Sequence, residues 1–153
     1  MIYDRMVADV NLAREIISKK VKKFVQLTDK EVQTLERGTI TINTLNRIEN
    51  KQNELRSLFN GLGYWNTDIE SKEWTFNDIF SIADFERILV NMDVLREAFY
   101  VYSSTPQTPQ SLYHYEVINS IEKILYDLEQ MIDDMRSKYR ECGTFQCGEV
   151  NGN

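Results

Sequence analysis

The side chains that most often perform catalysis are scarce in this sequence. It contains one histidine, His114, and two cysteines, Cys142 and Cys147. Nucleophilic catalysis needs a Ser or Cys beside a general base, and the spacing gives His114 no such partner. The sequence also lacks Gly-rich phosphate loops, His-Glu metal helices, nucleophile elbows and Walker motifs. We therefore expect no enzymatic activity, no cofactor and no small-molecule substrate, and we interpret His114 as an incidental surface or interface histidine.

The two cysteines flank residues 143–146, and this spacing leaves three states open. Cys142 and Cys147 can be free thiols packed at the end of a helical bundle, or they can close a small disulfide loop. They can also supply two of four zinc ligands, with the rest from a neighbouring subunit. Two cysteines alone are a weak metal signal, because a structural zinc site usually takes four protein ligands.

Carboxylates cluster between residues 122 and 134 and are a second candidate for metal or acid–base chemistry. Glu129 and Asp133 are four residues apart, so they share one face of a helix. A di-metal site of the ferritin kind needs a Glu three residues before a His on facing helices, and His114 has no such Glu. We interpret the cluster as a solvated acidic face, formed by Glu122, Asp127, Glu129, Asp133 and Asp134.

Lysines and tryptophans supply the candidate interface residues. The tryptophans lie in an aromatic-rich connection, where they would stack on a sugar or, more often, plug the end of a bundle. The lysines lie on the polar side of a predicted helix, where they form a solvated face or meet a nucleic acid or an acidic partner. Residues 1–60 carry a net charge of +3 and residues 61–153 carry −9, which predicts docking of the basic end on the acidic face of another copy. The candidates are Lys19, Lys20, Lys22, Lys23, Trp65 and Trp74.

Three series of apolar residues with heptad spacing predict the long helices that must position these candidates. Gln52 occupies the one polar place in the first series. Before them, Asp9 is expected to cap a helix, and Thr28 with Glu31 has the spacing of a capping box for a short helix over 29–36. Residues 39–42 alternate like a short strand. The series are Leu45, Ile48, Leu55 and Phe59; Phe85, Ile88, Met92, Leu95, Phe99 and Tyr102; and Ile118, Ile121, Leu125, Leu128, Ile132, Met135 and Tyr139.

The expected fold is all-α, an antiparallel three- to four-helix bundle with long heptad-patterned helices. In this arrangement the first helix covers one groove as the fourth. Gly and Pro total about 5% of the residues against a usual ~12%, which favours long helices. We expect one domain over 1–153, with an N-terminal arm at 1–8, an exposed loop at 103–110 and a C-terminal tail at 143–153. We find no internal repeat of fixed period.

Charge and hydropathy argue against two further classes of protein. The net charge of −6 argues against a non-specific nucleic-acid binder, which must neutralise phosphates. The longest apolar stretch, residues 98–102, is far shorter than the ~20 residues that span a bilayer. The N-terminus has no apolar core followed by a cleavage site, so we expect no membrane span and no signal peptide.

Three segments carry a resemblance to a known group of proteins. They are residues 38–52 (GTITINTLNRIENKQ), residues 63–67 (GYWNT) and residues 139–148 (YRECGTFQCG). Together they resemble an all-helical module of uncharacterised structural proteins encoded by phages and prophages of Gram-positive bacteria, and the likeness covers most of the chain. The resemblance implies a non-enzymatic virion protein that assembles with itself and with other virion proteins in the tail, baseplate or fibre-attachment region. It assigns no ligand-binding residue.

The same resemblance implies synthesis in the host cytoplasm and a final location in the virion. One alternative is a virion protein associated with the capsid or neck. Another is an intracellular helical adaptor or regulator that binds one partner helix along an open groove.

Overall fold

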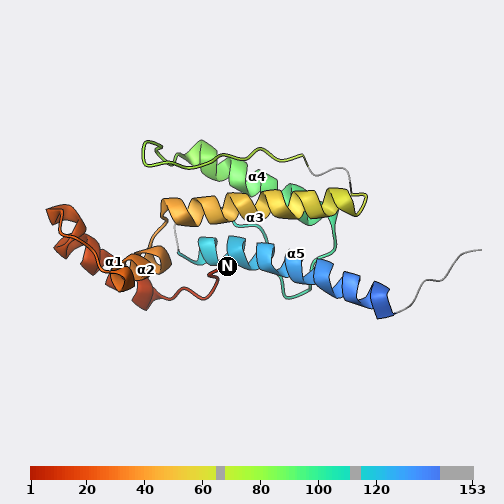
Figure 1. The fold of residues 1–153 in the computed structure, drawn as a ribbon, viewed down its shortest axis with the longest axis horizontal. Helices are drawn as coiled ribbons and strands as arrows, with labels where there is room; N and C mark the ends of the chain where they lie inside the picture. Colours follow the sequence, from red (N-terminus) through yellow and green to blue (C-terminus); the bar gives the residue numbers. More distant parts are fainter. Residues whose placement is uncertain (65–67, 111–114, 142–153) are drawn as a thin grey trace, which may run out of the picture.

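The computed structural model describes residues 1–64, 68–110 and 115–141. For residues 139–141 it describes the backbone only. The described residues form five α-helices and one 3-10 turn, with no strand among them, and the all-α class is therefore confirmed (Figure 1). None of these helices combines the length and apolar character needed to cross a membrane. The elements are α1 (Val7–Lys19), η1 (Val21–Lys23), α2 (Asp29–Gly38), α3 (Ile42–Gly61), α4 (Ile82–Ala98) and α5 (Tyr115–Glu141).

Side-chain caps fix where the helices begin. Thr28 and Glu31 form the expected capping box at the start of α2, and Ser81 with Asp84 forms another at α4. At α3 the hydroxyl oxygen of Thr41 accepts a hydrogen bond from the backbone N–H of Thr44 at 3.1 Å. The strand expected at residues 39–42 is therefore wrong, because its last residue already belongs to the helix that Thr41 caps.

Helices α3, α4 and α5 share one hydrophobic core, to which Ile69 and Trp74 of the connection before α4 also contribute. The core holds most positions of the three heptad series. The second series was expected to stay helical to Tyr102, but α4 ends at Ala98 and Phe99 has extended backbone angles. The buried core residues on the helices are Leu45, Ile48, Leu55, Phe59, Phe85, Ile88, Met92, Leu95, Val117, Ile118, Ile121, Ile124, Leu125, Leu128 and Ile132.

The three long helices run in the same direction, so the antiparallel arrangement expected from the sequence is wrong. Contacts between α3 and α4 advance together along both helices, from Glu49 with Arg87 to Phe59 with Phe99 just beyond α4. Contacts between α3 and α5 do likewise, from Arg47 with Glu122 to Lys51 with Glu129. Heptad spacing carries no information about direction, and the connections are long enough to run back along the helices (Figure 1).

Helices α1 and α2 pack on each other as a hairpin that projects beyond the N-terminal ends of α3 and α5 (Figure 1). The first helix therefore does not cover a groove of the bundle as a fourth helix, contrary to expectation. The N-terminal arm comprises residues 1–6 rather than 1–8, since α1 begins at Val7. Residues 103–110 are irregular, but this segment is only partly exposed because Thr105 is buried.

Candidate functional site

The hairpin is held together by a close approach of its two helices. A Cβ atom added to Gly38 would lie 2.2 Å from the carbonyl oxygen of Asp9 and 2.4 Å from the Cβ of Ala13, so only glycine fits there. Ala13 is the one buried side chain of α1, and α2 has none. The hairpin therefore folds against itself while burying very little apolar surface.

Ion pairs tie the hairpin at both ends. At one end Lys20 lies 2.7 Å from Glu31, and this ammonium, with the N–H of Thr28, lowers the pKa of Glu31 to about 2. At the other end Arg37 lies 3.2 Å from Asp9. The N–H of Met6 and the Arg37 guanidinium lower the pKa of Asp9 below its ordinary value. These pairs add to the close packing of the hairpin at Gly38.

The turn between α1 and α2 exposes an aromatic side chain in a strained backbone. Phe24 has a φ of 54°, a left-handed conformation that costs a non-glycine residue about 1–2 kcal/mol. Its side chain is 98% exposed, and Val21 and Val25 beside it are exposed as well. Lys22 and Lys23 are exposed and form no ion pair within the described residues. Residues Val21, Lys22, Lys23, Phe24 and Val25 are called the hairpin tip.

The arm fixes the hairpin to the bundle through two residues of α5. The side-chain amide of Asn119 accepts from the N–H of Arg5 at 3.2 Å and donates to its carbonyl at 2.9 Å. One turn on, Glu122 accepts from the N–H of Ile2 at 2.7 Å. The ring of Tyr3 lies 5.1 Å from that of Tyr126. The arm is therefore held in an extended conformation along one face of α5.

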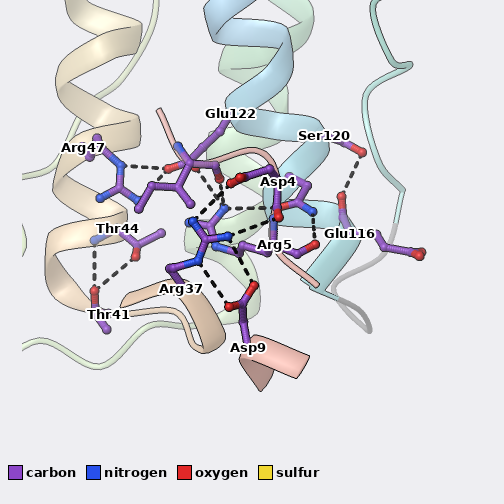
Figure 2. A network of polar contacts seen from close by, with 12 residues as sticks. Asp4, Arg5, Asp9, Arg37, Thr41, Thr44, Arg47, Glu116, Ser120 and Glu122 are labelled. Carbon is purple, nitrogen blue, oxygen red and sulfur yellow. Dashed lines mark hydrogen bonds and ion pairs between the residues drawn. The ribbon is translucent and has the colours of Figure 1, made fainter. Parts of the chain in front are cut away.

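Glu122 is also the centre of a buried charge cluster, drawn in Figure 2. Its Oε2 accepts from Nη1 of Arg5 at 2.9 Å, and its Oε1 accepts from Nε of Arg47 at 2.9 Å. The side chains of Glu122 and Arg5 are 0% and 2% exposed. Nε and Nη2 of Arg5 have no hydrogen-bond partner among the described residues. The cluster joins the arm, α3 and α5 at the expense of desolvating several charges.

A second extended segment, residues 68–74 and here called the strap, is held in the same way by α3. The amide of Asn46 accepts from the N–H of Trp74 at 2.7 Å and donates to its carbonyl at 3.0 Å. Glu49 accepts from the indole of Trp74 at 3.2 Å and from the N–H of Lys72 at 3.3 Å. Glu49 also pairs with Arg87, and this carboxylate raises the pKa of Arg87.

Asn91 of α4 binds the backbone of the strap as Asn46 does, through both the N–H and the carbonyl of one residue. Its amide donates to the carbonyl of Glu70 at 2.7 Å and accepts from the N–H of Glu70 at 3.3 Å. Asn91 also donates to Gln52, which in turn donates to the carbonyl of Ile88 at 3.0 Å. Each long helix thus uses one asparagine to hold both backbone groups of one extended residue.

Sequence reasoning missed these asparagine contacts, although a signal is present. The two fullest examples share the pattern Asn-x-Ile-Glu, at residues 46–49 and at residues 119–122. Asn and Glu lie three residues apart in both, so they share one side of the helix. The repeat is too short to appear as an internal repeat of fixed period, and its partners are distant in sequence.

The side of α4 that faces away from the core carries both apolar and acidic residues. Ile82 and Val90 are 74% and 60% exposed there, and Phe76 and Ile79 in the turn before the helix are 96% and 87% exposed. The carboxylates on this side form no ion pair within the described part of the chain. Residues Phe76, Ile79, Ile82, Glu86, Val90, Asp93 and Glu97 are called the α4 outer face.

The structure places the predicted lysines and tryptophans differently. Lys19 pairs with Glu15 within α1 and Lys20 pairs with Glu31, which leaves Lys22 and Lys23 without a described partner. Trp74 is only 3% exposed, so it is not available to a partner; it plugs the core between α3 and the strap. Trp65, His114, Cys142 and Cys147 lie outside the described residues, as does the tail at 143–153.

The expected solvated acidic face is wrong for two of its members. Glu122 and Asp127 are 0% and 3% exposed, because the arm and the segment after α4 cover α5 at these positions. Glu129 pairs with Lys51, while Asp134 accepts from the hydroxyl of Tyr102 and raises the pKa of Tyr102 to about 12. Asp133 is exposed. Within the described residues no group of three or more His, Cys, Asp or Glu could hold a metal ion.

No protein-family model, curated protein or solved structure matches this chain. Two surfaces present unsatisfied apolar and charged groups: the hairpin tip, which is basic, and the α4 outer face, which is acidic.

Proposed function

We propose that the protein is a non-enzymatic structural subunit that assembles in several copies on a phage particle, in the tail, baseplate or fibre-attachment region. The observation that carries the proposal is the hairpin, which projects from the bundle and exposes Phe24 at its tip. The resemblance of residues 38–52 and 63–67 to phage structural modules supports the assignment to a virion.

A projecting hairpin of this kind suits assembly better than catalysis. Exposed apolar side chains grouped on one element are typical of protein–protein contact sites. The arm holds the base of the hairpin through Asn119 and Glu122. An element that is already held in place loses less conformational freedom when a partner binds. Backbone strain such as that at Phe24 is concentrated at functional positions in proteins.

The uneven charge of the chain supports association of like copies. Residues 1–60 carry +3 and residues 61–153 carry −9, so the basic part of one copy attracts the acidic part of another. Such attraction falls with ionic strength, because exposed charges are screened within about 8 Å at physiological salt.

A second candidate function is an intracellular adaptor that binds one partner helix. A groove of about 540 Å³ beside the C-terminal half of α5 favours it, because the groove is mostly apolar. Its lining includes Tyr64, Phe99, Tyr102, Met131 and Met135. A helix with an apolar stripe fits such a groove.

Location separates these functions. Quantitative mass spectrometry of purified particles from a host strain carrying the gene should find the chain in several copies per particle. Cell lysate from the same culture, cleared of particles, is the control. Recovery of the chain from the lysate, together with its absence from the particles, would contradict the virion proposal and favour the adaptor.

A further inference from the structure

We infer that the hairpin tip of one copy docks on the α4 outer face of the next copy, so that copies join head to tail. The inference rests on the proposed function only in requiring self-assembly, and it names the two surfaces that meet. The tip supplies one aromatic side chain, two valines and two lysines. The outer face supplies four apolar side chains and three carboxylates.

Both surfaces expose large apolar side chains that can pack against each other. Phe24 stands out from the tip at 98% exposure, flanked by Val21 and Val25. On the other surface Ile82 and Val90 lie two turns apart on α4 and are 74% and 60% exposed. A single aromatic side chain buries about 150–250 Å² when it enters such a surface, so Phe24 would dominate the contact.

The charged parts are opposite in sign. Lys22 and Lys23 border Phe24, whereas Glu86 and Asp93 border Val90 along the same side of α4. Neither set forms an ion pair within the described ranges 1–64, 68–110 and 115–138. Each charge is therefore free to pair across the interface, which fixes the register of docking as well as steering encounter.

The two surfaces do not cover each other within one chain, since Phe24 and Phe76 are 98% and 96% exposed. The tip is the part of the hairpin farthest from the bundle (Figure 1). Contact between two different surfaces of identical copies is heterologous, and it leaves one tip and one outer face free at the ends. Repetition closes a ring or extends a filament, the two arrangements from which multi-copy assemblies are built.

The groove beside α5 is a poorer acceptor for the tip. Lys138 lines it, and Arg136 is exposed on the same part of α5. These cations would repel Lys22 and Lys23 at close range. The groove also holds one carboxylate, Asp134, which accepts a hydrogen bond from the hydroxyl of Tyr102. The α4 outer face carries three carboxylates and none of them forms an ion pair within the described residues.

Mixing two variants of the full chain tests whether the contact is heterologous. Phe24→Asp inactivates the tip and keeps the outer face, whereas Val90→Asp does the reverse; both positions are exposed, so folding is preserved. Light scattering across a concentration series should show wild-type assemblies that grow with concentration. Each variant alone should associate at least about tenfold more weakly, because truncation of an interface hot spot has that effect or more. The mixture should stop at a one-to-one dimer.

Exchange of charges tests the pairing itself. The double variants Lys22→Glu with Lys23→Glu, and Glu86→Lys with Asp93→Lys, should each be monomeric alone and should assemble when mixed. Arg14→Glu and Asp133→Lys are matched controls, since each reverses one exposed charge outside the two surfaces. The controls should assemble as the wild type does.

The outcomes separate this inference from the proposed function. Wild-type assemblies that survive both the tip and the outer-face variants would overturn the head-to-tail contact while leaving a multi-copy virion role intact. A wild-type chain that is monomeric at every concentration would overturn the contact as well, and mass spectrometry of particles would still decide the virion role.

Discussion

The arm and the strap are two extended segments that the helices hold by the same means. Asn119 holds both backbone groups of Arg5, and Asn46 does so for Trp74. Glu122 and Glu49, three residues later in each helix, accept from another backbone N–H of the same segment. One local pattern, Asn-x-Ile-Glu, thus fixes irregular chain against α5 and against α3.

The two segments differ in what they bury. The strap places Trp74 in the core, where the indole is 3% exposed and its N–H is satisfied by Glu49. The arm instead places Arg5 against Glu122, and two nitrogens of Arg5 have no partner among the described residues. Both segments meet a buried glutamate, but Trp74 adds apolar burial to the strap, whereas the arm depends more on buried charge, whose desolvation offsets much of its attraction. The arm, which positions the hairpin, is therefore the weaker attachment.

Removal of Glu122 should have the largest effect, because it leaves two guanidinium groups without their carboxylate. We expect Glu122→Leu to lower the free energy of unfolding by about 3–5 kcal/mol, the usual result of breaking a buried ion pair. Glu49→Leu should cost less, about 1–3 kcal/mol, since Arg87 is 19% exposed and also donates to the carbonyl of Glu70. Urea denaturation of both variants measures the difference.

A charge-free replacement is the control for this prediction. The triple variant Glu122→Leu, Arg5→Met and Arg47→Met removes every charge of the cluster and should recover most of the lost stability. A triple variant as unstable as Glu122→Leu alone would show that the loss comes from packing or from the N–H of Ile2. The arm and the strap would then not differ in the way described.

Removal of the asparagines should have the next largest effect and should separate local from global unfolding. Asn119→Ala and Asn46→Ala each leave one N–H and one carbonyl unpaired, at a cost of about 1–3 kcal/mol. We expect Asn119→Ala to speed amide exchange in residues 2–6 and in the hairpin, with little change in α3. Asn46→Ala should instead destabilise the whole bundle, because the strap carries Trp74 into the core.

Native-state hydrogen exchange with urea denaturation distinguishes these responses. Equal exchange profiles for the two variants would contradict the comparison of the arm with the strap. Asn50→Ala is the matched control, since Asn50 is an exposed asparagine on α3.

The sequence predicts the core better than the attachments, for physical reasons. Burial of Ile48, Leu55 and Leu128 follows from apolar spacing, and the caps at Thr28 and Ser81 follow from local residue pairs. The direction of the helices does not follow, because a heptad pattern is the same for parallel and antiparallel neighbours.

The candidate site could be predicted only where it depends on local sequence, as the core and the helix caps could. The run of lysines predicts the exposed polar face of a helix, and Lys22 and Lys23 are indeed exposed, but they lie in the turn η1 because α1 ends at Lys19. The exposure of Phe24 depends on a positive φ, and the burial of Trp74 depends on Asn46, far away in sequence. Contacts between residues far apart in the sequence produce no periodic pattern of residue types.

Acidification should have the smallest effect and should loosen the hairpin before the bundle. Glu31 has a pKa of about 2 in the folded chain against 4.5 ordinarily, and the pKa of Asp9 is lowered from 3.8. A lowered folded pKa means that the stabilisation is fully present above pH 4.5 and is lost as the pH falls toward 2. Asp78, which pairs with Lys72 of the strap, also has a pKa of about 2, but Trp74 still holds the strap in the core.

Amide exchange in α2, corrected for intrinsic rates, should therefore rise between pH 4.5 and pH 2 while exchange in the middle of α3 changes little. Glu31→Gln removes the titrating group, so α2 of this variant should exchange faster at neutral pH and should change less on acidification. Equal acceleration of α2 and α3 would contradict the prediction, since it would place the acid-sensitive groups in the shared core rather than in the ion pairs of the hairpin.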